Sequence, residues 1–275
     1  MGPVVFANIS TTKDNDMTDQ SVFVGADVGS SQTKLAVLDT KKRLIGYAIK
    51  KSGTDFTATS NDCLASALKM AGVTPDQIVH TVSTGYGRKN VEFSNATKTE
   101  ISCHARGCYH YFPLAITIID IGGQDNKVIK LDDQGHRLNF KMNRKCAAGT
   151  GAFLEEMALR LDIPVEDMND LAVQSQNMER LGSFCTVFSG TEVLEKIRNG
   201  KKVPDIVKGL FFSVIRRVME MDSLTENVVM TGGVVAHNPY LVTMTEELIG
   251  RDIRVAEHPQ LTGAVGAALY AMGGK

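Results

Sequence analysis

An internal repeat constrains this chain more than any other feature of its sequence. The two copies read DVGSSQTKLAVL from Asp27 and DIGGQDNKVIKL from Asp120, so they begin 93 residues apart. Each copy follows a run rich in β-branched residues, turns at Asp-x-Gly and continues into a second apolar run. This pattern is typical of a strand, a tight glycine-containing turn and a second strand. Two copies predict a duplicated fold of two lobes, with a ligand in the cleft between them.

Short apolar runs alternate with segments of helical periodicity, which predicts an α/β class with antiparallel hairpins mixed in. The expected strands cover 22–27, 34–39, 43–50, 78–83, 115–121, 127–131, 138–142 and 228–230. The expected helices cover 58–71, 152–161, 165–174, 192–197, 205–221, 240–249 and 263–272. We expect a polar tail over 1–20, a first lobe over 21–114 and a second lobe over 115–275, with the last helix near the cleft.

Composition narrows the functional classes. The 30 Lys and Arg residues balance 31 Asp and Glu residues, so the chain lacks the basic excess that is typical of nucleic-acid binding. Its apolar runs are shorter than the roughly 18 residues that a membrane span needs. The first residues do not follow the pattern of a secretory signal, and the five cysteines are odd in number. These features predict a cytoplasmic protein with reduced thiols and with neither nucleic acid nor membrane as a partner.

The two Asp-x-Gly turns have the chemistry of a phosphate site. Glycine lets backbone N–H groups approach an anion, and hydroxyl groups add donors. A strand-terminal aspartate can hold water on a divalent cation or orient an attacking water. A plain β-turn would explain one such turn, whereas two matching copies favour a ligand site. The candidate residues are Asp27, Gly29, Ser30, Ser31 and Thr33 in the first turn and Asp120, Gly122, Gly123 and Gln124 in the second, with Asp120 and Gln124 as candidate catalytic residues.

A third glycine turn follows the expected strand 228–230. There Gly232 and Gly233 would allow a flat ring such as adenine to lie against the backbone, and Gln260 is a further candidate for contacting adenosine. The sequence contains neither the G-x-x-x-x-G-K-[ST] pattern of a P-loop nor a strand-linked G-x-G-x-x-G fingerprint. The common nucleotide folds that carry those motifs are therefore not indicated.

Two of the five cysteines differ from the rest. Cys146 and Cys185 each lie just before an expected helix start, where the helix dipole and unpaired N–H groups favour a thiolate. The simplest interpretation of Cys63, Cys103 and Cys108 is that they are buried structural thiols. A [4Fe–4S] cluster typically takes four thiolates, so a cluster is one hypothesis for the pair if two copies of the chain contribute two thiolates each.

These motifs together carry a family resemblance. The segments IDIGGQDNKVIK, STGYGR, SCHARG, MNRKCAAGTG, CTVF and MTGGV are similar to those of 2-hydroxyacyl-CoA dehydratase activators and benzoyl-CoA reductase ATP-binding subunits. That family lies within the superfamily of acetate kinase, sugar kinases, heat-shock chaperones and actin. The similarity spans residues 21 to 273, and the combination of CAAGTG with a later CTVF is specific to the family.

The resemblance implies a duplicated, two-lobe, actin-like (ribonuclease H-like) ATPase fold that binds ATP or ADP and Mg²⁺. It also implies a homodimer in which Cys146 and Cys185 of both copies hold one bridging [4Fe–4S] cluster. A ferredoxin or flavodoxin would reduce this cluster, and ATP hydrolysis would drive one electron to an acyl-CoA dehydratase or reductase.

Other functions remain open at this stage. The chain could be the ATP-binding subunit of a benzoyl-CoA reductase-type enzyme or the reductase of another iron–sulfur partner. It could also be a plain small-molecule kinase or a chaperone-like ATP-binding module without redox chemistry. A brown colour in anaerobically purified protein would indicate an electron donor, and would distinguish it from the kinase and from the chaperone-like module.

Overall fold

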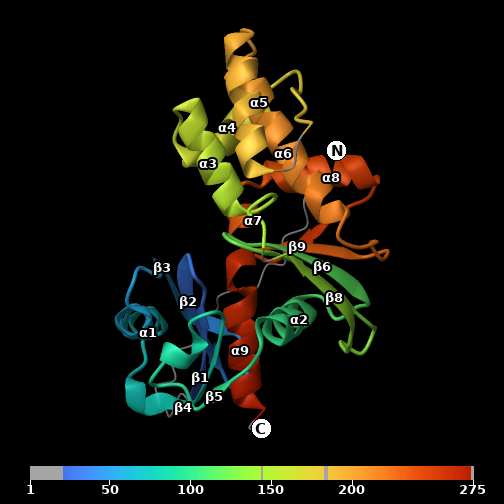
Figure 1. Cartoon of the computed structure of the whole chain (residues 1–275). Helices are drawn as coiled ribbons and strands as arrows, with labels where there is room; N and C mark the ends of the chain where they lie inside the picture. The colour runs from blue at the N-terminus through green and yellow to red at the C-terminus, as the bar shows by residue number, and fades with distance from the viewer. Residues whose placement is uncertain (1–20, 144, 183–184, 274–275) are drawn as a thin grey trace. The chain divides into compact units, whose positions relative to one another are not determined.

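The computed structural model describes residues 21–143, 145–182 and 185–273, so the expected tail over 1–20 lies outside the described residues. The chain divides into two compact units (Figure 1). We call residues 21–114, 131–137 and 256–273 the first unit, and residues 115–130 and 138–255 the second unit. This grouping differs from the division expected from the sequence, because residues 131–137 and 256–273 join the first unit.

The first unit is built on a five-stranded sheet with the order β3-β2-β1-β4-β5. Its strands are β1 (Val22–Val28), β2 (Gln32–Asp39), β3 (Leu44–Lys51), β4 (Ile78–Thr84) and β5 (Ala96–Thr97). Strands β1, β2 and β3 pair antiparallel, whereas β4 is parallel to both β1 and β5. The helices of this unit are α1 (Phe56–Ala71), α2 (Glu100–Tyr111) and α9 (Thr262–Met272) among the described residues.

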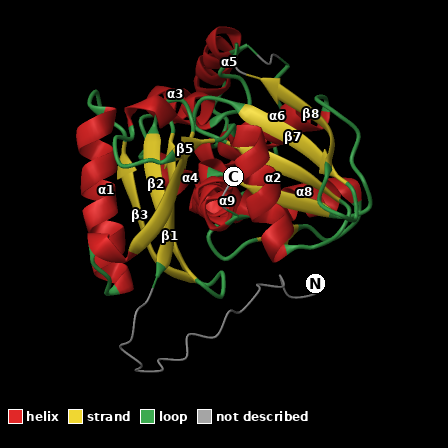
Figure 2. Cartoon of the chain, turned by 90° about the horizontal axis from the view of Figure 1, so that it is seen from below, coloured by secondary structure: helices red, strands yellow, loops and turns green. Residues whose placement is uncertain are grey.

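Helices cover both faces of this sheet. On β2, Leu35 and Val37 belong to the core that includes Ala67 and Leu68 of α1. The alternate residues, Ala36 and Leu38, pack with Ala264, Val265 and Ala268 of α9. Successive strand residues point to opposite faces, which explains why β2 is apolar without alternation. Figure 2 accordingly shows α1 on one side of β1, β2 and β3 and α9 on the other.

The second unit is built on a sheet with the order β10-β9-β6-β7-β8. Its strands are β6 (Ile116–Ile121), β7 (Asn126–Leu131), β8 (Arg137–Asn143), β9 (Val228–Thr231) and β10 (Arg254–Val255). Its helices in the described residues are α3 (Gly151–Leu161), α4 (Met168–Gln174), α5 (Thr186–Arg198), α6 (Val203–Met219), α7 (Gly233–His237) and α8 (Tyr240–Ile249). Its core joins Ile119 and Val128 of the sheet to Phe153, Met157 and Phe211 of the helices.

The two sheets have the same topology, and this confirms the duplicated α/β fold expected from the repeat. Strands β6 to β10 take the same places in their sheet as β1 to β5 take in theirs. Both Asp-x-Gly turns close with the same bond, from Gly29 N–H to Gln32 O (3.0 Å) and from Gly122 N–H to Asp125 O (2.9 Å). The connections differ: α1 links β3 to β4, whereas α3, α4, α5 and α6 lie between β8 and β9.

The repeat also extends beyond the segments that suggested it. Asp27 pairs with Thr84 across parallel strands β1 and β4, and Asp120 pairs with Thr231 across β6 and β9. Each threonine is followed by a glycine of positive φ, Gly85 at 90° and Gly232 at 103°. Residues 84–85 and 231–232 are therefore equivalent Thr-Gly turns beside equivalent aspartates.

The expected strands and helices are present, with shifted ends. The predicted helix 192–197 is the second half of α5, which starts at Thr186, and the segment 165–174 divides into a 3-10 turn (Val165–Asp167) and α4. Helix α2 was not predicted, because its buried face consists, apart from Ile101, of small, sulfur-containing and polar residues and gives little apolar periodicity. The short elements β5, β10 and α7 were also missed. No helix in the described residues has the length and apolar character that crossing a bilayer requires.

Helix α9 packs on its neighbours almost backbone to backbone. A Cβ placed on Gly25 of β1 would lie 1.9 Å from the carbonyl oxygen of Ala264. A Cβ on Gly266 would lie 1.8 Å from the carbonyl oxygen of Cys103, and one on Gly107 of α2 would lie 2.0 Å from that of Thr262. Three glycines therefore set the distances between β1, α2 and α9, since backbone atoms cannot move aside as side chains can.

We predict that Gly266→Ala destabilises the fold by about 3 kcal/mol, because the added methyl group overlaps backbone that is fixed on both sides. The matched control is Gly273→Ala at the end of the same helix, where the nearest neighbouring atom would be 3.7 Å from the new Cβ. Urea unfolding of the two variants checks this prediction. Equal midpoints for G266A and G273A would show that α2 and α9 can separate at little cost.

Candidate functional site

The first Asp-x-Gly turn belongs to the first unit and joins β1 to β2. Asp27 is buried near the end of β1, opposite Lys34, whose Nζ lies 3.9 Å from Asp27 Oδ2. Ser30 and Ser31 are exposed at the tip, while Gly29 is partly buried. Two predicted phosphate ligands, Ser30 and Ser31, are thus accessible from solvent.

Thr33 has a different environment from the two serines. It is fully buried, and its hydroxyl lies 3.0 Å from the Ser52 hydroxyl. Ser52 also donates to the carbonyl oxygen of Gly29 (2.6 Å), and its N–H donates to that of Ser31. Thr33 therefore takes part in the hydrogen-bond network that holds the turn, whereas its role as a ligand stays a prediction.

The second Asp-x-Gly turn belongs to the second unit and joins β6 to β7. Asp120 is 3% exposed, Gly122 and Gly123 are partly buried, and Gln124 is exposed at the tip. Asp120 Oδ2 accepts a hydrogen bond from Lys127 Nζ at 3.0 Å. The aspartate is therefore buried and held by an ion pair near the end of the central strand β6, while the side-chain amide of Gln124 is exposed to solvent.

The third glycine turn lies against the second one. A Cβ placed on Gly232 would lie 2.3 Å from the carbonyl oxygen of Ile121 and 2.9 Å from Asp120 Oδ1. Gly232 also has φ 103°, so both its conformation and its surroundings require glycine. Gly233 is the first residue of α7. The structure thus places Gly232 beside Asp120. Such proximity is required if the second and third glycine turns contact the same ligand.

Gln260 belongs to the first unit, in a 3-10 turn (Pro259–Leu261) that leads into α9. Its Oε1 is buried and has no hydrogen-bond partner among the described residues. A buried acceptor without a partner is costly, so this atom suits a donor group of a ligand or an ordered water. Its predicted contact with adenosine stays a prediction.

Three hydrogen bonds connect the second turn to the segment that carries Cys146. The N–H groups of Gly151 and Ala152, at the start of α3, donate to the carbonyl oxygens of Gly122 (2.9 Å) and Gly123 (2.8 Å). The side chain of Asn126, just after the turn, donates to the carbonyl oxygen of Gly149 (2.7 Å). These bonds have no local sequence signal, since they join a turn to a helix start that the chain places more than 20 residues later.

The five cysteines fall into two groups, and none of them forms a disulfide. Cys146 is half-buried and Cys185 is exposed, and Cys185 is the N-cap residue of α5. Cys63, Cys103 and Cys108 are buried, in agreement with the structural role expected of them. Burial raises the pKa of the Cys63 thiol to about 11 and that of Cys103 to about 12. Cys146 and Cys185 are therefore the thiols that a reagent can reach from solvent.

A single chain does not complete a metal centre in the part that the structure describes. No three His, Cys, Asp or Glu side chains of the described residues gather where they could hold a metal ion. Cys146 and Cys185 precede helices α3 and α5, which belong to the same unit and pack against one another. Their role as metal ligands stays a prediction.

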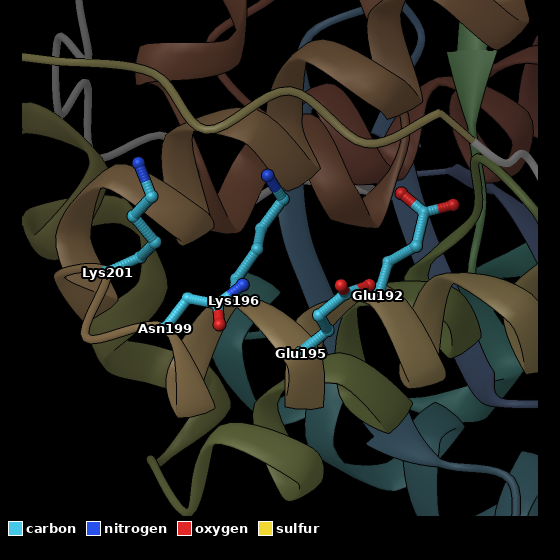
Figure 3. Close-up of a pocket in the computed structure, with 5 residues that line it drawn as sticks. All are labelled: Glu192, Glu195, Lys196, Asn199 and Lys201. Carbon is cyan, nitrogen blue, oxygen red and sulfur yellow. The ribbon is translucent and has the colours of Figure 1, made fainter.

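A small surface hollow of about 260 Å³ lies along α5, away from the residues discussed above (Figure 3). It is lined by Glu192, Glu195, Lys196, Asn199 and Lys201. Lys196 and Lys201 bind Glu179 at 3.0 and 2.7 Å, and these hydrogen bonds hold the pKa of Glu179 below its usual value. The lysines of the hollow are therefore already engaged by a protein carboxylate.

A duplicated pair of sheets with an Asp-x-Gly turn in each copy defines the class of ATP-binding proteins to which sugar kinases and actin belong. Within this class, the model of the BadF/BadG/BcrA/BcrD ATPase family matches residues 24–271. The chain belongs to that family.

The chain is 44% identical to an activator of lactoyl-CoA dehydratase from Anaerotignum propionicum, over 90% of this chain and 96% of that protein. The activator of 2-hydroxyisocaproyl-CoA dehydratase from Clostridium difficile, solved with bound ADPNP, has a TM-score of 0.85 and 41% identity over 92% of this chain and 94% of that one. Component A of (R)-2-hydroxyglutaryl-CoA dehydratase from Acidaminococcus fermentans has a TM-score of 0.87 and 38% identity over 92% and 98%.

A further relative carries a different name. One of the subunits of benzoyl-CoA reductase from Thauera aromatica is 26% identical over 91% of this chain and 93% of that protein. The resemblance deduced from the motifs, which included both groups, is confirmed.

We predict that a thiol reagent added to metal-free, anaerobic protein near neutral pH modifies Cys146 and Cys185 rapidly. Cys63, Cys103 and Cys108 should react only after denaturation, because they are buried and because the raised pKa values of Cys63 and Cys103 leave little thiolate. Raising the pH increases the thiolate fraction of every thiol but does not expose the buried ones. Peptide mapping by mass spectrometry identifies the modified residues, and early labelling of Cys63 or Cys103 would contradict the assignment.

Proposed function

We propose that this chain is an ATP-dependent, one-electron donor that activates a 2-hydroxyacyl-CoA dehydratase. The observation that carries the proposal is the set of hydrogen bonds that join the second Asp-x-Gly turn, the proposed phosphate site, to the segment that follows Cys146. The high identity to proteins named as activators of such dehydratases supports the choice of partner.

The nucleotide half of the proposal uses the three glycine turns. The first turn (Asp27, Gly29, Ser30, Ser31, Thr33) and the second turn (Gly122, Gly123) bind the phosphates and Mg²⁺ of ATP, and Gly232, Gly233 and Gln260 contact adenosine. The ADPNP-bound relative supports the binding of this class of nucleotide. Asp120 has one oxygen bonded to Lys127, so it suits the orientation of a water, attacking or bound to Mg²⁺, better than direct metal ligation. Gln124 is the second proposed catalytic residue, since its exposed amide can both donate to and accept from that water.

The redox half of the proposal uses Cys146 and Cys185. Both fit a cluster ligand, since neither is fully buried, and Cys185 is the N-cap residue of α5, where the helix dipole stabilises the extra charge of a reduced cluster. Two thiolates supply half of the usual ligands, and a second copy of the chain supplies the other half across a twofold axis. When bound, a [4Fe–4S] cluster supplies a site for one electron at low potential.

The surroundings of Cys185 support a homodimer. Val187 and Phe188, directly after this thiol on α5, are 71% and 65% exposed. Apolar side chains beside a site that must exclude water are typical of a surface that a partner covers. We therefore propose that a second copy covers these residues, that a ferredoxin or flavodoxin donates the electron and that the dehydratase accepts it.

The first test is the ATPase activity itself. We expect Asp120→Asn to lower turnover by about 10²–10³-fold, as the loss of one preorganised catalytic group typically does. The substitution keeps the size of the side chain, so the fold should persist. Asp133→Asn, in the exposed turn between β7 and β8, is the matched control. Steady-state phosphate release measures both variants, and full turnover in D120N would remove Asp120 from the mechanism.

The second test is the metal content of anaerobically purified protein. We expect about four iron atoms per two chains, with Cys146→Ala and Cys185→Ala each abolishing the iron and the brown colour. Cys63→Ala should retain both, because Cys63 is a buried core residue of α1 that packs against β2. Four irons per single chain would refute a cluster shared between copies. Iron retained by both accessible-thiol variants would refute the assignment of the ligands.

A further inference from the structure

One buried cation, the side chain of Lys127 just after the second turn, has no role in the function proposed so far. Lys127 lies on β7, and its side chain is only 5% exposed. Its Nζ lies 3.0 Å from Asp120 Oδ2 and 2.8 Å from Asp125 Oδ1. A buried ammonium is retained when it has charged partners, so Lys127 and the two carboxylates form one unit, which we call the lysine clip.

The lysine clip fixes the carboxylate of Asp120 from one side, and Gly232 limits it from the other. Lys127 holds Oδ2, while Oδ1 lies against the position that a Cβ of Gly232 would occupy, 2.9 Å away. Rotation of the carboxylate would therefore break the ion pair with Lys127, and a side chain larger than that of Gly232 would displace Oδ1. This leaves Asp120 in one orientation before any nucleotide binds, which is the property that a water-orienting group requires.

The equivalent residues of the first turn provide an internal comparison. Lys34 stands where Lys127 stands in the repeat, and it faces Asp27 in the register of β1 and β2. Its Nζ is 3.9 Å from Asp27 Oδ2, and Gln32 takes the place of Asp125. Gly85 lies against Asp27 Oδ1 as Gly232 lies against Asp120 Oδ1. The two turns have the same arrangement of aspartate, lysine and glycine. Only the second turn has a further carboxylate, that of Asp125, and only there does the lysine lie within 3.0 Å of the aspartate.

We propose that Lys127 is a positioning residue that holds Asp120 in the orientation needed for ATP hydrolysis, with Asp125 as its anchor. This proposal rests on the proposed ATPase function. It adds that the two aspartates of the repeat, Asp27 and Asp120, have different roles. Asp120 orients the reacting water, whereas the more loosely held Asp27 assists binding. Lys127 itself contacts neither nucleotide nor water in this scheme, and it acts through Asp120.

The test is a set of variants of the full chain assayed for ATP hydrolysis. We expect Lys127→Met to lower kcat by about 10²-fold, as a misplaced catalytic group typically does, and to leave KM for ATP close to the wild-type value. Lys127→Arg, which keeps the charge, should retain most of the turnover. Lys130→Met is the matched control, because Lys130 lies on the same strand and loses a comparable ion pair, with Asp222 at 3.0 Å, outside the turn. This control should keep wild-type kinetics.

A double variant separates positioning from a purely structural role. If Lys127 acts through Asp120, adding Lys127→Met to Asp120→Asn causes no further loss of kcat, because the group that Lys127 positions is already gone. An equal loss in the wild-type and Asp120→Asn backgrounds would overturn the proposal, as would wild-type kcat in K127M.

Should K127M not fold, Asp125→Gln replaces it in the same cycle, since Asp125 is 22% exposed and the variant copies the first turn. A crystal structure of either variant gives a readout that does not need turnover. The proposal requires the Asp120 carboxylate to leave its position, and an unmoved carboxylate overturns it. Absence of ATPase activity in the wild-type chain would instead refute the proposed function.

Discussion

The second unit depends on the contact between a β-turn and a helix start. The first N–H groups of α3 have no partner within the helix, and two of them, from Gly151 and Ala152, donate to the carbonyl oxygens of Gly122 and Gly123. The turn therefore caps the helix with its own backbone. Hydrogen bonds of this kind contribute about 1 kcal/mol each, but an unpaired buried group costs more. A displacement of the turn must consequently be followed by the start of α3 or must break both bonds.

This contact explains why the two halves of the duplicated fold can have different tasks. In the first half, α1 alone connects β3 to β4 and packs on the sheet. In the second half, the same connection is expanded into α3, α4, α5 and α6, and the expansion begins with the segment from Cys146 to Gly151. The insertion thus contains both Cys146, in the segment before α3, and Cys185, the N-cap residue of α5. Two sheets of the same topology thus carry very different helical structure in the equivalent connection.

The repeat and the longer sheet strands were predictable from the sequence, because they depend on local patterns such as Asp-x-Gly after a β-branched run, whereas the roles of the candidate residues stay predictions. The sequence did not predict α2, whose buried face contains Cys103, His104 and Gly107, since close packing on α9 replaces apolar periodicity there. The Thr84-Gly85 turn was also missed, although its match to Thr231-Gly232 was visible in the sequence. The offset between these turns is larger than 93 residues, since the helical insertion separates them, and a search at a fixed period does not find it.

Lys127 illustrates a second kind of feature that the sequence does not predict, which is the burial of a charged side chain. Its alignment with Lys34 was visible, but a strand lysine is most often solvated, and only the structure shows it to be buried between Asp120 and Asp125. The same limit applies to Asn126, which looks like an ordinary turn residue. Its side chain donates to Gly149 O, and Gly149 has φ 82°, so the backbone that leads from Cys146 into α3 bends back toward the turn. Side-chain ion pairs therefore fix the aspartate, whereas backbone and amide hydrogen bonds connect the turn to the thiol segment. A ligand of the turn shifts the position of the thiol segment through this connection only to the extent that it binds the shifted and unshifted states with different affinity.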